Sequence, residues 1–379
     1  MKYMILRCED LAAGTDQTPS LLENSKLGHL QQLAQAGAGG TIQLSSRRPT
    51  HRFDLHRGLL GLNSDEPGVS AAQCYAAGAN ILLGEGETAW CCELITHQEG
   101  RILDATAGRI TTKESELLVH ALDEELGSDS LRWEIGEGPH HLLITTDPDF
   151  ERHGSGRVPA PELLVGEAWR DHLPKGVQGD ALAAVIEQAA AILEPHPVNR
   201  VRVDLRENPA NLVWLWGAAQ VATPAPFRQQ TGFSGAVSSS HFLLRGLARC
   251  LGLGWRQGPA SLEDATMQRW TSSAARLIRE HDLTYLHLPI ETADPVERLC
   301  AMERMDHMVH TLTDTLSKQP WRLLVVLDER REQTVPFVAI GTGLPQQPVT
   351  KLHTAELAES PLRFDTAAEL FSWFTRRAA

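Results

Sequence analysis

The final third of the chain repeats one pattern of apolar and polar positions. Short apolar runs predict buried strands, and between them lie longer stretches with an apolar residue at every third or fourth position, which predict helices. The strands are expected at 235–238, 284–288, 322–327 and 337–340, and the helices at 239–251, 262–281 and 296–316. Strands that alternate with long helices favour an α/β fold with a mostly parallel sheet between helices.

The start of the chain fits the same sheet. Residues 3–8 predict a first strand, residues 26–36 a helix that Gly37 ends, and residues 41–45 a second strand. The segment 47–56 is polar and poor in β-formers, so we expect a long connection there. Ligands of such sheets bind at the carboxyl ends of the strands, which is where we expect the site.

The middle of the chain has a different order of predicted strands and helices. Strands are expected at 89–96, 131–135, 141–145 and 200–205, around helices at 113–126 and 180–193. This pattern predicts an inserted α+β cap domain. We therefore expect a core domain formed by residues 1–70 and 220–379 and a cap domain formed by residues 71–219.

Composition narrows the possible partners. The 379 residues are 42% apolar and carry a formal net charge of −13, without any basic run. Nucleic acid and anionic membranes need a positive surface, so neither is expected as a partner. The six cysteines form no C-x-x-C pair, and the apolar stretch at the N-terminus is too short for a secretory signal. We expect a cytoplasmic protein that binds a small molecule or a protein.

One segment identifies a family. Residues 208–217 read N-P-A-N-L-V-W-L-W-G and resemble the segment N-P-A-N-x-I-W-L-W-G of the archaeal-type cofactor-independent phosphoglycerate mutases, which belong to the alkaline phosphatase superfamily. Residues 92–96 (C-E-L-I-T) resemble that family's C-N-L-V-T, and residues 303–306 (E-R-M-D) resemble its E-R-I-D. The resemblance implies an alkaline-phosphatase-like core with a cap. It also implies interconversion of 3- and 2-phosphoglycerate, a step of glycolysis, through a phosphoserine beside two divalent metals, usually manganese.

The chain departs from the family where the chemistry takes place. The family's first metal-binding segment, I-G-D-G-M, aligns with residues 7–11, R-C-E-D-L, and its nucleophilic serine aligns with Arg52. The phosphoserine mechanism is then unavailable unless Ser45, Ser46 or Thr50 takes over the role of the serine. The metal motif D-E-A-G-H that should follow His287 lacks its histidine, and P-D-H is reduced to residues 327–329, L-D-E. Losing the serine and these histidines together predicts a degenerate site that binds no metal tightly. We expect no cofactor, or manganese or magnesium if the chain is active.

Two sets of residues remain candidates at this site. A cationic cluster in an otherwise acidic chain predicts binding of phosphate or another anion. It consists of His51, Arg52, His56 and Arg57, with Arg330 and Arg331 as further members. The residual candidates for metal ligands are Glu9, Asp10, Asp294 and Asp328.

Three functions stay open. The first is a catalytically degenerate member of the family that binds a small phosphorylated ligand or a protein partner. The second is an active mutase or phosphotransferase with a rearranged metal site, since carboxylates alone can hold magnesium. The third is an interaction scaffold, which an exposed apolar patch on the cap would favour. For the run Ser238 to Ser240 before His241 we expect helix capping, because no G-x-S-x-G motif surrounds it.

Overall fold

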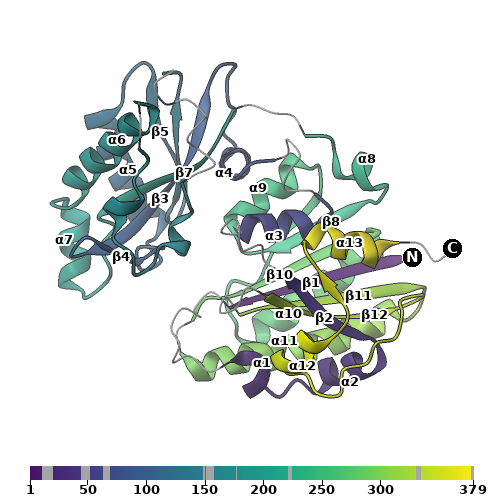
Figure 1. Ribbon diagram of the computed structural model, residues 1–379. Helices are drawn as coiled ribbons and strands as arrows, with labels where there is room; N and C mark the ends of the chain where they lie inside the picture. The colour runs from purple at the N-terminus through teal and green to yellow at the C-terminus, as the bar shows by residue number, and fades with distance from the viewer. Residues whose placement is uncertain are drawn as a thin grey trace. The chain divides into compact units, whose positions relative to one another are not determined.

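The computed structural model describes residues 1–10, 20–43, 52–62, 69–147, 150, 158–175, 177–220, 224–292, 294–329 and 334–376. The chain divides into two compact units (Figure 1): 1–68 with 225–241 and 251–379, and 69–224 with 242–250. The α/β class predicted from the sequence is confirmed. No helix among the described residues has the length and apolar character needed to cross a membrane.

The first unit is built on an eight-stranded sheet in the order β13-β2-β12-β11-β1-β10-β8-β9. Only β12 runs against its neighbours, so the sheet is mostly parallel. Its strands are β1 (Lys2–Asp10), β2 (Ala38–Gln43), β8 (Gly235–Ser239), β9 (Gly254–Gln257), β10 (Leu283–Ile290), β11 (Trp321–Asp328), β12 (Thr334–Gly341) and β13 (Arg363–Phe364).

Helices cover both faces of this sheet. The main apolar core lies on the face toward α2, α10 and α11, where Met4, Leu6 and Cys8 of β1 are buried. Helices α3 and α13 pack on each other, and Tyr3 of β1 packs on Phe374 of α13. The helices of the unit are α1 (Leu21–Asn24), α2 (Gly28–Ala36), α3 (Arg52–Leu59), α8 (Phe227–Thr231), α10 (Asp264–Glu280), α11 (Pro295–Leu316), α12 (Thr354–Glu359) and α13 (Ala367–Thr375).

The second unit is an antiparallel sheet with helices against it. Its strands are β3 (Thr88–Gln98), β4 (Arg101–Asp104), β5 (Leu131–Glu137), β6 (His140–Thr145) and β7 (Leu212–Gln220). Its α-helices are α4 (Ala71–Ala79), α5 (Thr112–Leu126), α6 (Val177–Leu193), α7 (Pro197–Asp204) and α9 (Phe242–Cys250). Helix α9 clusters with this unit, although its residues lie within the range that we expected for the core domain.

Two predicted elements are wrong. Helix α3 starts at Arg52, inside the segment where we expected a connection. Residues 197–204 form helix α7, although the alternation of valine and arginine at 200–203 predicted a strand. The alternation is overridden by helix-start signals, because Pro197 occupies the first turn and the His196 side chain accepts a hydrogen bond from the backbone N–H of Val198.

Candidate functional site

Strand β1 carries two charged residues into the interior of the first unit. Successive strand residues point to opposite faces, so Arg7 and Glu9 lie on the face opposite the main core. The register places Arg7 beside His287 of β10, and Glu9 beside Asp328, the last residue of β11. These four side chains therefore gather toward the carboxyl edge of the parallel strands, where ligands of such sheets bind.

The Arg7 guanidinium lies between two carboxylates. Its Nη2 atom is 2.6 Å from Oδ2 of Asp328 and 3.2 Å from Oε2 of Glu9. The Arg7 side chain is fully buried, and the side chains of Glu9 and Asp328 are 2% and 8% exposed, respectively. Burial disfavours the charged guanidinium, but Glu9 and Asp328 outweigh it and raise the pKa of Arg7. A permanent internal cation therefore pairs with both carboxylates.

A chain of hydrogen bonds joins this ion pair to β8. Nε2 of His287 lies 2.8 Å from Oε2 of Glu9, and Nδ1 lies 2.8 Å from Oγ of Ser239, the last residue of β8. Ser239 also accepts a hydrogen bond from the backbone N–H of His241, just before α9 begins. Ser239 thus contacts both the backbone just ahead of α9 and the histidine of β10.

His56 of α3 joins the cluster from outside the sheet. Its Nδ1 is 2.6 Å from the hydroxyl of Tyr285 on β10, and its Nε2 is 3.8 Å from Oε2 of Glu9. Burial and the positive charge of Arg7 hold the pKa of His56 well below its usual value. Burial likewise raises the pKa of Tyr285. Both groups are therefore neutral near pH 7, and Arg7 supplies the positive charge at Glu9.

The cluster can be compared with the needs of a divalent metal. Among the described residues, only Glu9, His56 and His287 bring three potential ligand atoms within 4.8 Å of one another. The shared oxygen of Glu9, however, is already in contact with the guanidinium of Arg7 and with His287. A divalent cation there would lie close to a buried positive charge and would have to displace these contacts. The residues present do not fit the family's metal while Arg7 is in place.

The predicted site residues fall into three groups. Glu9, Asp328 and His56 are brought together. Arg57 lies 3.5 Å from Asp54 of its own helix and over the ring of Phe53.

Asp294 is an exposed N-cap of α11, whose side chain accepts hydrogen bonds from Val296 and Glu297. His51, Arg330 and Arg331 lie outside the described residues, as do the side chains of Asp10 and Arg52.

Three partners in the cluster were not among the residues that we singled out from the sequence: Arg7, His287 and Tyr285. Each is buried within a strand of the central sheet, and a buried charged or polar residue needs a partner. Arg7 inside Y-M-I-L-R-C-E was the available signal, because a buried arginine needs hydrogen-bond acceptors from neighbouring elements.

Comparison with known proteins gives the family. A family model described as 2,3-bisphosphoglycerate-independent phosphoglycerate mutase matches residues 57–199. The enzyme of that name from Methanosarcina barkeri is 31% identical over 272 residues, which are 68% of this chain and 66% of that protein. The one from Methanothrix thermoacetophila is 28% identical over 372 residues, 91% of this chain and 92% of that protein. The chain thus spans somewhat less than two thirds of the first relative and nearly all of the second.

A solved structure agrees with these matches at the level of the fold. The cofactor-independent phosphoglycerate mutase from Thermoplasma acidophilum superposes with a TM-score of 0.57 at 22% identity, over 99% of each chain. The resemblance inferred from the sequence motifs is thereby confirmed, and the chain belongs to the 2,3-bisphosphoglycerate-independent phosphoglycerate mutases of the archaeal type.

Proposed function

We propose that this chain is a phosphoglycerate-mutase-like protein that binds a small phosphorylated ligand and has lost the metal-dependent phosphoserine reaction. The observation that carries the proposal is Arg7, fully buried and paired with both Glu9 and Asp328. In a metal-dependent site such carboxylates would neutralise a divalent ion. Here a side chain of the protein itself neutralises them, so the site needs no ion for charge balance.

The sequence supports the same conclusion at the position of the nucleophile. The family's serine position is Arg52, so the hydroxyl that would carry the phosphoryl group is missing from its usual place. An arginine in that position adds positive charge, which suits retention of a phosphate rather than its transfer. The proposed ligand is therefore an anion of the phosphoglycerate type, held near the start of α3.

A second candidate is an active mutase with a rearranged metal site. It is favoured by one observation, the grouping of Glu9, His56 and His287 within 4.8 Å. All three side chains are buried, and neutral histidines are good ligands for manganese and related ions. This candidate requires that Arg7 move away when a metal binds.

Metal content and turnover separate the two candidates. The protein is purified with and without added manganese and dialysed, its metal is quantified, and conversion of 3-phosphoglycerate is measured with manganese, magnesium or a chelator. The Methanosarcina barkeri relative, named as a phosphoglycerate mutase, serves as the positive control. We expect substoichiometric metal, no turnover, and calorimetric binding of 3- or 2-phosphoglycerate that a chelator leaves unchanged. Stoichiometric manganese with turnover would establish the second candidate instead, and absence of any binding would reject the ligand.

A further inference from the structure

Helix α7 of the second unit buries polar side chains and exposes apolar ones, the reverse of what is usual for a helix that packs on its own domain. Its buried side chains are Asn199 and Arg202, whereas Val201, Val203 and Leu205 at its end are 56%, 58% and 65% exposed. A surface helix normally buries its apolar stripe and exposes its polar residues. The apolar side chains of α7 therefore contribute little to the fold of their own unit.

Polar contacts hold the helix in place. Arg202 donates hydrogen bonds to the carbonyls of Asn208 and Ala107 and pairs with Glu114 at 2.7 Å. Asn199 exchanges hydrogen bonds with the backbone of Ala210, at 2.9 and 2.8 Å. Because these bonds fix the helix on its polar side, the apolar residues are displayed in a defined arrangement rather than on a loose segment.

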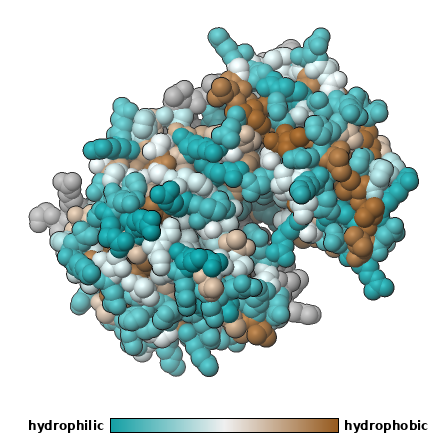
Figure 2. All heavy atoms as spheres, turned by 180° about the vertical axis from the view of Figure 1, so that it is seen from behind, coloured by the Kyte–Doolittle hydropathy of each residue, from teal (hydrophilic) through white to brown (hydrophobic). Residues whose placement is uncertain are grey.

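Apolar exposure continues beside the helix. Asn208, just after α7, donates a hydrogen bond to Asp104 at the end of β4. Leu103, which precedes Asp104 in β4, is 48% exposed. Val165, in the segment that pairs with β4, is 51% exposed. Figure 2 shows brown side chains gathered in bands on the surface of this unit. Exposed apolar surface of this kind marks an interaction site on soluble proteins.

We propose that α7 docks against α7 of a second copy of this chain, antiparallel, across a two-fold axis. Val201 and Leu205 lie one turn apart on one side of the helix and would form the contact. Arg200 and Asp204, both exposed, are one turn apart as well. An axis near Arg202 brings Arg200 opposite Asp204 of the partner subunit, and the reverse pair follows from the symmetry.

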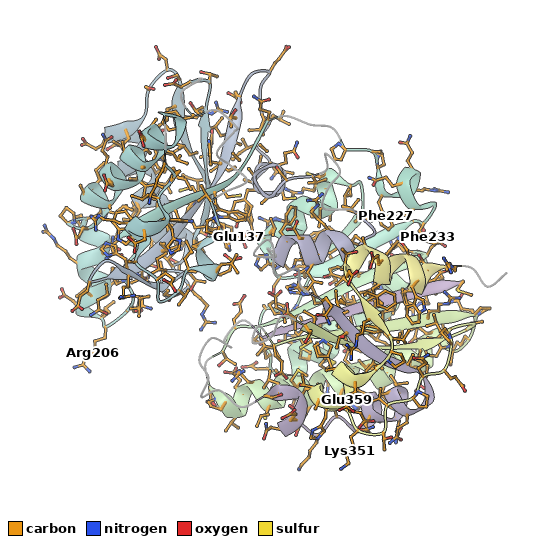
Figure 3. All side chains as sticks on the ribbon, viewed as in Figure 1. Glu137, Arg206, Phe227, Phe233, Lys351 and Glu359 are labelled. Carbon is orange, nitrogen blue, oxygen red and sulfur yellow. The ribbon has the colours of Figure 1, made fainter. Side chains whose placement is uncertain are left out.

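The charge around α7 favours a second copy over other partners. The chain carries a net charge of −13, so most of its surface repels another copy. The exposed residues of this segment are balanced instead, with Arg200 and Arg206 against Asp204 and Glu207. Arg206, labelled in Figure 3, points away from the unit. A neutral strip with both signs is a place where two acidic chains can meet without net repulsion.

The size of the surface sets the strength of the dimer. Helix α7 has eight residues and is about 12 Å long, which is short for a standard interface, where each partner buries roughly 800 Å². We therefore expect a dimer that dissociates on dilution.

Sedimentation equilibrium over a wide concentration range tests the proposal. The wild-type chain is expected to change from monomer to dimer as concentration rises. Leu205→Glu should remain a monomer throughout, because a buried carboxylate would be left without a partner. The matched control is Leu82→Glu, at a leucine of the same unit that is 91% exposed, and it should dimerise like the wild type. Thermal melting of each variant checks that these exposed substitutions leave the fold intact.

A charge exchange makes the test specific for this geometry. Arg200→Asp places two like charges together at each end of the interface and should abolish the dimer, whereas Arg200→Asp combined with Asp204→Arg should restore it. A wild-type chain that stays monomeric, a dimer that survives Leu205→Glu, or a double variant without recovery would each overturn the proposal. None of these outcomes depends on the metal or ligand measurements above.

Discussion

Replacing Arg7 with methionine removes the guanidinium and keeps most of the side-chain volume. Glu9 and Asp328 would then be two carboxylates, 2% and 8% exposed, that have lost their shared cation. Removing one partner of a buried ion pair costs about 3 to 5 kcal/mol in unfolding free energy, mainly because the other charge stays buried and unpaired. We expect a loss in this range at pH 7, measured by urea denaturation.

The same change should create a metal site. With the guanidinium gone, Glu9 and Asp328 are released beside His56 and His287, a set of oxygen and nitrogen donors that suits manganese. A ligand that binds only the folded state at 100 times its dissociation constant adds about 2.7 kcal/mol of stability. Manganese should therefore recover much of the stability of Arg7→Met and leave the wild type unchanged.

Arg322 provides the matched control. It is another buried arginine of the same sheet, but its guanidinium bonds to the backbone carbonyls of Thr342, Phe374 and Arg376 and to no carboxylate described by the structure. Arg322→Met should also destabilise the fold, because carbonyl acceptors lose their donors, yet manganese should not rescue it. If Arg7→Met unfolds at the wild-type urea concentration, or if both variants respond equally to manganese, the internal-cation argument is refuted.

Three further predictions concern single positions. Burial lowers the pKa of His141 to about 3, so below pH 6.5 the unfolded chain takes up a proton that the folded chain does not. Unfolding free energy should then fall by about 1.4 kcal/mol per pH unit, and His141→Gln should flatten this slope in urea titrations at several pH values. Asp294→Ala removes a helix N-cap and should cost about 1 kcal/mol without altering calorimetric ligand binding. In Gly246→Ala the new Cβ would lie 1.7 Å from the carbonyl oxygen of Cys74, and the strain should lower the stability by about 1 to 3 kcal/mol in thermal melts.

Much of the first unit could be predicted because its signals are local. Buried parallel strands are short apolar runs, and the helices between them keep their period, so β10, α11 and β11 appear where the pattern placed them. Helix α7 could not be recognised by period, since its valines alternate with arginines as in a strand. Besides the helix-start signals at His196 and Pro197, the buried contacts of Arg202 with Ala107 and Glu114, which are distant in sequence, hold this segment in place.

The site shows the same division. Its location at the carboxyl ends of the strands followed from the fold class, and Glu9 and Asp328 followed from aligned motifs. The role of Arg7 did not follow, because it depends on a register between strands that are more than 300 residues apart in sequence. Asp294 stood close to the same motif, yet its side chain only caps α11. Motif position identifies candidate residues, whereas strand register decides which of them meet.

The contacts of Ser239 could belong to a structural network or to a catalytic one. Its hydroxyl contacts His287, which contacts Glu9, in the order of a serine, histidine and carboxylate relay. Ser239 and His287 have no solvent exposure, however, and Glu9 is also in contact with Arg7. If Nε2–H of His287 donates to the Glu9 carboxylate, Nδ1 of the neutral imidazole is left to accept a hydrogen bond from the Ser239 hydroxyl.

The serine therefore orients the histidine that supports Glu9. We expect Ser239→Ala to lower the unfolding free energy by about 1 to 3 kcal/mol, because Nδ1 of His287 and the backbone N–H of His241 each lose a partner. Ser239→Thr, which retains the hydroxyl, should lose less. Incubation with a fluorophosphonate, followed by mass spectrometry, should leave Ser239 unmodified in the folded wild type. Stoichiometric labelling that His287→Asn abolishes would instead show an activated nucleophile, and the buried network would then have to open during a reaction.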